Sequence, residues 1–174
     1  REGPTLLKEI DLYLHFLRGH FRCARIKFIG GNRTGTRQCL EEIAGYLSRN
    51  WVGAEVLPVI KGEYALLMHD LGDETAGHQW LEEFPPSEQS EQMPLRQFIS
   101  LNLSHHLISM KLLLVYQCWQ EAERLAQNQQ TRAEQEGRTG SLIQWLILRT
   151  LLNQAQGNTG QALSVITCAL TLAE

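Results

Sequence analysis

Residues 141–174 read SLIQWLILRTLLNQAQGNTGQALSVITCALTLAE, and this stretch decides the fold class. Apolar residues recur at helical spacing on both sides of a break at Gly157, which predicts two helices joined by a tight turn. The same arrangement is anchored earlier at Gly31, Gly72 and Gln117, so that successive anchors lie 41, 45 and 40 residues apart. Self-similarity at this period is typical of α-helical repeat proteins, which present a curved surface for binding.

The side chains that follow each anchor repeat as well. A small residue comes five positions after the anchor and an apolar or small residue nine positions after it, in the pairs Thr36 and Leu40, Gly77 and Leu81, Ala122 and Ala126, and Ala162 and Ile166. We expect an all-α fold, a right-handed superhelix of about four TPR-like helical hairpins in a single domain. The expected hairpins cover residues 4–50, 51–86, 94–137 and 139–174, with helices over 4–28, 36–48, 54–70, 73–84, 95–117, 119–136, 141–155 and 158–174.

One segment favours a different interpretation. Residues 24–29 alternate like a strand, and the following residues 30–35 resemble a phosphate-binding loop. A P-loop needs a lysine that reaches the terminal phosphates, and Thr36 stands at that position. We therefore predict a helix followed by a glycine-rich turn, and no cofactor in this chain.

The composition argues against several classes of protein. The net charge of −3 gives no overall attraction to nucleic acid or to an anionic membrane, although residues 1–49 hold nine Lys and Arg against five Asp and Glu. No apolar run is long enough to span a bilayer, and the four cysteines are far apart, which suits a cytoplasmic protein. Because the chain begins at Arg1 and stops within an apparent helix, we expect it to be a piece of a longer protein.

The repeat register gives a column of candidate ligand-binding residues. In the last hairpin a stripe at i, i+4 spacing runs from Ser141 to Asn153, opposite an apolar side made by Leu142, Ile143, Leu146, Ile147 and Leu151. First helices of such hairpins usually line the concave face, so carrying this register back gives the groove candidates Tyr64, His105, Ser109, Trp145 and Arg149. Aromatic rings beside hydroxyl and guanidinium donors suit a sugar or an aromatic acid. The alternative is that these aromatic rings pack against the neighbouring hairpin.

Other residue groups are weaker candidates. His105 and His106 point about 100° apart on a helix and do not converge on one metal ion. Arg18, Arg22 and Arg25 form a basic face that either contacts phosphate or an acidic partner, or is simply solvated. No nucleophile, base and orienting group occur together, so we expect no catalytic residue and no metal site.

The segment 112–174 resembles the helical-repeat region of the MalT-type regulators, the large ATP-binding members of the LuxR family. Residues 154–163, QAQGNTGQAL, match the family phrase QAQGDTEQAL almost unchanged, and residues 136–143, EGRTGSLI, match the linker before it. An earlier repeat of this chain also resembles the family. Gly72 and Asp73 are similar to the family's turn, and WLEE at 80–83 is similar to the helix that follows that turn. The chain departs from the family at Gln117, where glycine is usual, and residues 1–50 match only in outline.

The resemblance implies one part of a three-part activator. In that family an upstream domain binds ATP, the helical superhelix senses an inducer, and a C-terminal helix-turn-helix binds DNA. The implied partners are a small-molecule inducer and the two flanking domains, with self-association left open and no direct contact with nucleic acid or a membrane. The alternative function is a protein-protein interaction scaffold that binds a peptide or another protomer and no small molecule. An enzyme on a helical scaffold is a third class, which no residue pattern favours.

Overall fold

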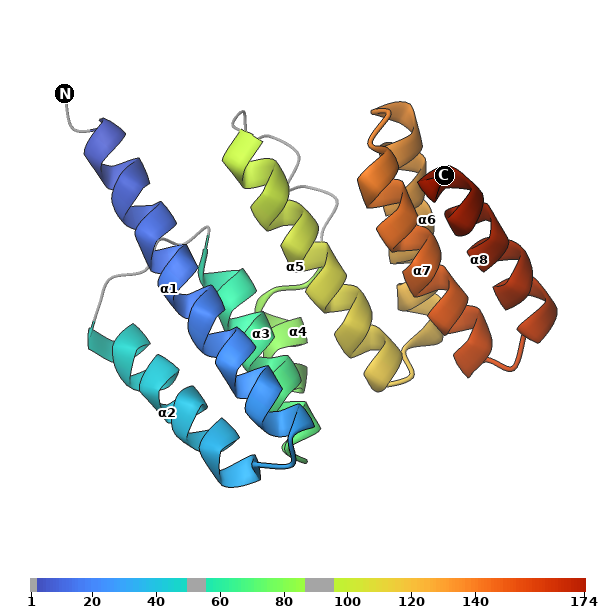
Figure 1. Cartoon of the computed structure of the whole chain (residues 1–174). Coiled ribbons are helices and arrows are strands. Elements are labelled where there is room, and N and C mark those ends of the chain that lie inside the picture. The colour runs from blue at the N-terminus through green and yellow to red at the C-terminus, as the bar shows by residue number, and fades with distance from the viewer. Residues whose placement is uncertain (1–2, 50–55, 87–95) are drawn as a thin grey trace. The chain divides into compact units, whose positions relative to one another are not determined.

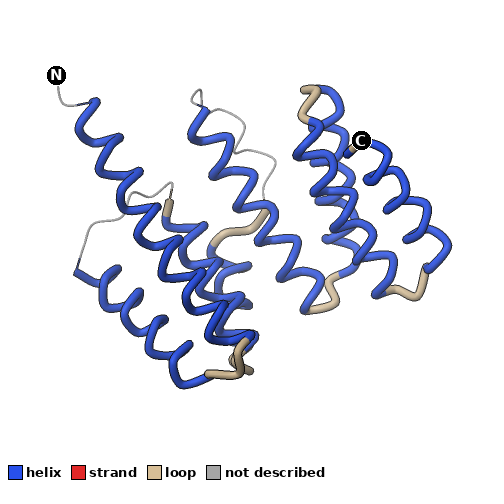
Figure 2. The backbone as a smooth tube through the Cα atoms, in the orientation of Figure 1, coloured by secondary structure: helices blue, strands red, loops and turns tan. Residues whose placement is uncertain are grey.

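The computed structural model describes residues 3–49, 56–86 and 96–174 of the chain. Within these ranges the chain forms eight α-helices and no strand, so the prediction of an all-α fold is confirmed (Figures 1 and 2). The helices belong to two compact units, Arg1–Phe84 and Pro85–Glu174, which divide between the second and third predicted hairpins. No helix in the described part of the chain has the length and apolarity that crossing a membrane requires.

Unit 1 contains two helical hairpins. Helix α1 (Gly3–Ile29) packs along α2 (Arg33–Arg49), α3 (Leu57–Asp70) packs along α4 (Thr75–Glu83), and α1 also contacts α3. Apolar side chains recur at helical spacing on these helices, so each helix turns one stripe inward. The buried side chains of this unit include Leu17, Phe21, Ala24, Leu40, Ile43, Leu67 and Trp80.

Unit 2 also contains two hairpins, and here the packing between them is continuous. Helix α5 (Arg96–Val115) packs on α6 (Trp119–Gln135), and α7 (Thr139–Ala155) packs on α8 (Thr159–Ala173). Helix α7 also lies along α6 and touches α5, which joins the hairpins. The buried side chains include Ala122, Leu125, Ala126, Trp145, Leu146, Leu152 and Ala162.

Each first helix ends at a residue with left-handed backbone. Gly31, Gly72 and Gly157 have φ angles of 76°, 92° and 79°, a region that glycine adopts without steric cost. Gln117 adopts the same region with φ of 58°, although it carries a side chain. The four anchors of the sequence pattern are therefore left-handed residues at which the hairpins turn. A fifth left-handed residue, Gly137 with φ of 63°, lies in the turn between α6 and α7.

The same hydrogen bonds close these turns. In the last hairpin the N–H of Gly157 donates to the carbonyl of Gln154 at 3.1 Å, and the N–H of Asn158 donates to that of Asn153 at 2.8 Å. The equivalent two bonds occur at the other three anchors. This Schellman arrangement satisfies carbonyl groups that the end of a helix leaves without partners. Because the turn is the same, positions counted from the anchor can be compared between repeats.

Some helix boundaries differ from the sequence prediction. The strand-like residues 24–29 lie inside α1, so the predicted helix and glycine-rich turn are confirmed there. Helix α2 begins at Arg33 rather than Thr36, because the side chain of Asn32 accepts the N–H of Gly35 at 2.8 Å and caps the helix. The right-handed superhelix predicted for the whole chain stays a prediction.

Charged side chains pair at the end of α6. Glu136 accepts a hydrogen bond from Arg132 at 2.8 Å and forms an ion pair with Arg138 at 2.6 Å. The bond from Arg132 and the charge of Arg138 hold the pKa of the Glu136 carboxyl below its usual value. These partly exposed pairs order the turn between α6 and α7 and add little to stability.

The left-handed anchors give opposite expectations for two substitutions. Gly157→Ala should lower the free energy of unfolding by about 1–2 kcal/mol, because a Cβ disfavours this backbone conformation. Gln117→Gly should raise it by up to about 1 kcal/mol, since the exposed Gln117 holds the same conformation at a cost. Urea denaturation of the purified chain measures both. Gly160→Ala is the control, because Gly160 lies within α8 with open space at its Cβ; an equal loss of stability there would contradict the argument.

Candidate functional site

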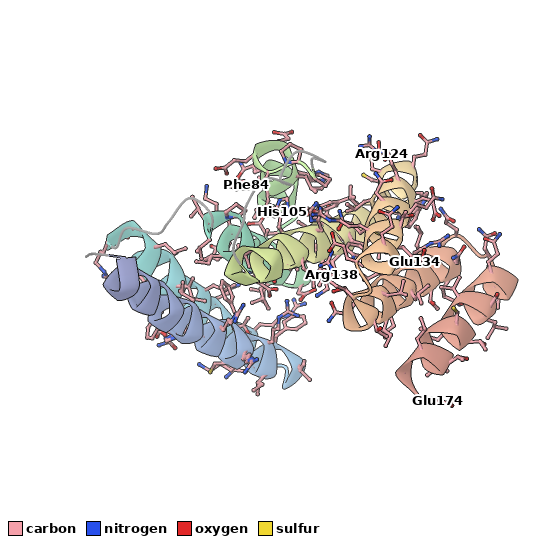
Figure 3. The ribbon with its side chains drawn as sticks, turned by 90° about the horizontal axis from the view of Figure 1, so that it is seen from above. Phe84, His105, Arg124, Glu134, Arg138 and Glu174 are labelled. Atoms are coloured by element: carbon pink, nitrogen blue, oxygen red, sulfur yellow. The ribbon has the colours of Figure 1, made fainter. Side chains whose placement is uncertain are left out.

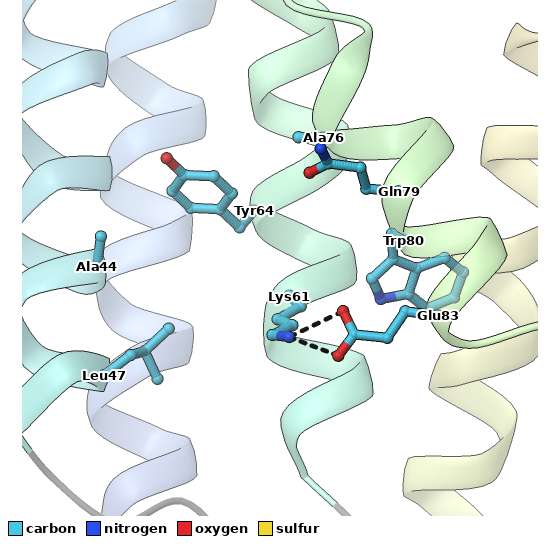
Figure 4. A pocket seen from close by; sticks show the side chains of 8 residues that line it. All are labelled: Ala44, Leu47, Lys61, Tyr64, Ala76, Gln79, Trp80 and Glu83. Atoms are coloured by element: carbon cyan, nitrogen blue, oxygen red, sulfur yellow. Dashed lines mark hydrogen bonds and ion pairs between the residues drawn. The ribbon is translucent and has the colours of Figure 1, made fainter.

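A pocket of about 320 Å³ opens in unit 1 between α2, α3 and α4 (Figure 4). Three helices supply its lining: Ala44 and Leu47 from α2, Lys61 and Tyr64 from α3, and Ala76, Gln79, Trp80 and Glu83 from α4. Apolar and aromatic groups dominate this lining, with a few polar groups among them. That mixture is typical of sites that bind small organic molecules.

Trp80 is held in place by its own contacts. The side chain is buried, and the indole N–H donates to the carbonyl of Pro58 at 2.7 Å. The ring of Phe84 lies beside it, with 5.9 Å between ring centroids. Because its N–H group is used within the protein, Trp80 offers the pocket an aromatic surface and no hydrogen-bond donor.

Lys61 and Glu83, which both line the pocket, form an ion pair that is accessible to solvent. The ammonium of Lys61 donates to both carboxylate oxygens of Glu83, at 2.7 and 2.9 Å, and lies 5.3 Å above the ring of Phe84. Both side chains are exposed to solvent, so the pair can exchange partners at little cost. Tyr64 points across the pocket toward α2 (Figure 4).

The pocket exists because α3 does not pack closely against α2. The equivalent helices of unit 2, α7 and α6, do pack against each other. In unit 2, Arg149 of α7 donates to Gln130 at 2.6 Å and to Glu123 at 3.1 Å, both on α6, and so fills the contact between the hairpins. Counted from the turn anchors, Tyr64 takes the place of Arg149 and Ala44 takes the place of Gln130. The short side chain of Ala44 cannot bridge to α3, and the corresponding space in unit 1 stays open.

The stripe predicted to lie opposite the apolar side of α7 is itself packed inside unit 2. Trp145 is 1% exposed and Arg149 is bonded to α6. Ile147 and Leu151, which were expected on the buried side, are exposed. The predicted face is wrong because a helix between two neighbours buries more than one side. In addition, the guanidinium of Arg149 uses Nη1 and Nη2 to bond α6 side chains, so this polar residue belongs to the contact between the helices.

Only one groove candidate lies at the pocket. Tyr64 lines it, whereas Ser109 is buried and donates to the carbonyl of His105 at 3.0 Å. The half-buried ring of His105 lies edge-on to that of His106, with 5.4 Å between centroids. A ligand-binding role for Tyr64, His105, Ser109, Trp145 and Arg149 stays a prediction, and Tyr64 is the member with space beside it.

Sequence reasoning missed Lys61, Gln79 and Trp80 as pocket residues. The signal that could have found them is Ala44, a short side chain at the position where the later repeat has Gln130. A short residue at a contact between repeats indicates a gap, and the residues around that gap follow from the register.

The remaining sequence candidates lie outside the pocket. Arg18 and Arg22 are exposed on α1, while Arg25 is used internally and donates to Glu63 at 2.7 Å. The ammonium of Lys27 donates to the sulfur of Cys39 at 3.2 Å, and this hydrogen bond raises the pKa of Lys27. Among the described residues, no three His, Cys, Asp or Glu side chains are grouped so that they could hold a metal ion.

The repeated turn and the paired helices define the class of protein, a TPR-like helical-repeat module. A family model described as the MalT-like TPR region matches residues 1–174, and the chain belongs to this family. The match confirms the resemblance seen in the last repeats and extends it to residues 1–50, which matched only in outline. No curated protein and no solved structure matches the chain.

The contacts of Trp80 predict how much the pocket wall contributes to folding. Trp80→Phe should lower the free energy of unfolding by about 1–2 kcal/mol, because the hydrogen bond to Pro58 and part of the buried ring are lost. Trp119→Phe is the matched control, since Trp119 is only half-buried. Thermal or urea unfolding of both variants measures the difference. Equal losses in the two variants would show that Trp80 has no special part in holding α4 against α3.

Proposed function

We propose that this module senses a small-molecule effector for a MalT-like transcriptional activator of the LuxR family, and that the effector binds in the pocket beside Tyr64. Membership of the MalT-like TPR region family supports the first part. The observation that carries the second part is the open contact between α2 and α3, which has an aromatic and apolar lining. The module acts by binding in the cytoplasm, with no catalytic step of its own.

The pocket favours a small organic ligand with a flat or apolar body and one or two polar groups. Its volume of about 320 Å³ lies at the lower end of ligand sites, which suits an aromatic acid or a small sugar. The rings of Tyr64 and Trp80 offer surfaces for stacking, and Gln79 offers an amide. A ligand carboxylate would compete with Glu83 for the ammonium of Lys61.

The position of the pocket suggests a mechanism. It lies between two hairpins, so a ligand that fills it holds α2 at a fixed distance from α3 and α4. A ligand shifts such an equilibrium only by as much as it binds one arrangement better than another. A molecule that spans from Ala44 to Tyr64 binds one spacing of the hairpins best, and it therefore favours one curvature of unit 1.

The rest of the proposal follows the family resemblance. Curvature in this module would be communicated to an upstream nucleotide-binding domain, where ATP binds, and to a downstream DNA-binding domain. The module itself would make no direct contact with DNA or a membrane and would hold no cofactor. Its net charge of −3 is consistent with a role that does not involve nucleic acid.

A pocket-filling variant tests this function. We expect at least one compound in a panel of aromatic acids and sugars to raise the melting temperature in proportion to dose. At 100 times its dissociation constant, such a ligand should stabilise the fold by about 2.7 kcal/mol. In Ala44→Trp the indole occupies the pocket, and the dissociation constant measured by calorimetry should rise about tenfold or more.

The control separates the pocket from the rest of the module. Ala155→Trp adds the same ring at an exposed position near the end of α7 and should leave affinity unchanged. Equal affinity in Ala44→Trp and the native chain would remove the pocket from the proposal. A folded chain that binds no compound of the panel, but binds a peptide, would favour the scaffold function instead.

A further inference from the structure

Lys61 and Glu83 are the two charged residues among the eight that line the pocket (Figure 4). The Nζ atom of Lys61 donates to both carboxylate oxygens of Glu83, so the ammonium already binds a carboxylate with two contacts. The side chains of Lys61 and Glu83 are 41% and 51% exposed, and an ion pair this open to water is replaced at little cost. The carboxylate of Glu83 therefore lies at a position that the carboxylate of a ligand can take.

Lys61 is the partner that stays in place when the pair opens. Its ammonium lies 5.3 Å from the ring centroid of Phe84, the residue directly after α4 (Figure 3), and the face of an aromatic ring attracts a cation. The ring of Phe84 in turn packs beside the buried Trp80, with 5.9 Å between ring centroids. An arriving anion therefore meets a cation that the protein already holds in position.

Glu83 is the partner that leaves. It is the last residue of α4, where the negative end of the helix dipole disfavours a carboxylate. It is also the more exposed of the two side chains, so it can turn into solvent once a ligand bonds Lys61. A cationic ligand would require the opposite exchange, in which Lys61 gives up its contacts with both Glu83 and Phe84. The asymmetry of the pair favours an anionic ligand.

The rest of the lining suits a ligand with one charged end rather than one with many hydroxyl groups. The indole N–H of Trp80 is used by the carbonyl of Pro58, which leaves Tyr64 and Gln79 as the other polar side chains of the lining. A sugar carries a hydroxyl on most of its carbon atoms, and burying such groups without partners is costly. An aromatic body with a single carboxylate needs few partners, and its ring matches the apolar surface.

We propose that the pocket selects aromatic carboxylates, and that Glu83 is a built-in competitor whose carboxylate occupies Lys61 until the carboxylate of the ligand replaces it. This inference rests on the proposed effector site and adds the chemical class of the effector. Lys61 bonds the ligand carboxylate, while the rings of Tyr64 and Trp80 contact the aromatic body. Competition with Glu83 raises the effector concentration to which the module responds.

Three compounds with the same body and different charge test the class: phenylacetate, phenylacetamide and phenethylamine. Titration of the isotope-labelled chain, followed by NMR, measures the dissociation constant of each compound. Phenylacetate should bind about tenfold more tightly than phenylacetamide, because its carboxylate gains a charge-assisted bond from Lys61. Phenethylamine should bind least tightly, since its ammonium is repelled by that of Lys61.

Two variants separate the roles of the charged residues. In Lys61→Gln, phenylacetate should bind no better than phenylacetamide, because the cation is gone. In Glu83→Gln, the affinity for phenylacetate should rise about threefold to fivefold, because the competing carboxylate is removed, while the affinity for phenylacetamide stays the same. Glu82→Gln is the matched control. It removes the same charge from the neighbouring exposed residue, which does not line the pocket, and should change neither affinity.

The contrary results are distinct. If phenylacetamide binds as tightly as phenylacetate and is lost in Ala44→Trp, the pocket remains an effector site but the preference for a carboxylate is wrong. If phenethylamine binds most tightly and is lost in Glu83→Gln, the pocket takes cations instead. An unchanged affinity for phenylacetate in Glu83→Gln excludes Glu83 as a competitor. If none of the three compounds binds the native chain or Glu83→Gln, the inference fails, and the wider panel decides separately whether the pocket binds an effector.

Discussion

The left-handed residue at the end of each first helix is the constraint on which the other features depend. Because the first helix ends at an equivalent residue, side chains at the same distance in sequence from the anchor lie on the same side of that helix. Within each unit that side faces the preceding hairpin. The position eight residues before the anchor holds Tyr64 in unit 1 and Arg149 in unit 2, and both face the second helix of the hairpin before. The turn thereby determines which side chains meet, and the identity of those side chains determines whether the contact closes.

A closed and an open contact differ here by very few side chains. In unit 2, Arg149 reaches two polar partners on α6, and Trp145, one turn earlier on α7, is buried. In unit 1 the corresponding residues include Tyr64 and Ala44, which leave a pocket. A cavity costs stability because its lining atoms lose dispersion contacts. The hydrogen bond from Trp80 to Pro58 keeps the wall in place despite that cost.

The fold could be predicted from the sequence because its signals are local. The anchors, the apolar periodicity and the N-cap at Asn32 all act within one turn of helix. The site could be predicted only in part, since register alone does not tell which of several buried sides a residue faces. Tyr64 was found because it shares a position with Arg149, whereas Lys61 and Gln79 join the pocket through the geometry of three helices. The polar character of Arg149 led to the wrong prediction of an open face, because the side chain lies in the contact between α6 and α7.

The α6–α7 and α2–α3 contacts differ in how they could respond to a ligand. The α6–α7 contact is tied by hydrogen bonds to a charged group, which have strict geometry and tolerate little sliding. The α2–α3 contact has no such bond from Tyr64 to Ala44 and is lined by groups that accept a range of spacings. A molecule that fills this gap would supply the missing contacts there, whereas at Arg149 the bonds to α6 already occupy the contact. The proposed effector therefore acts on unit 1, where the contact between the two hairpins is open.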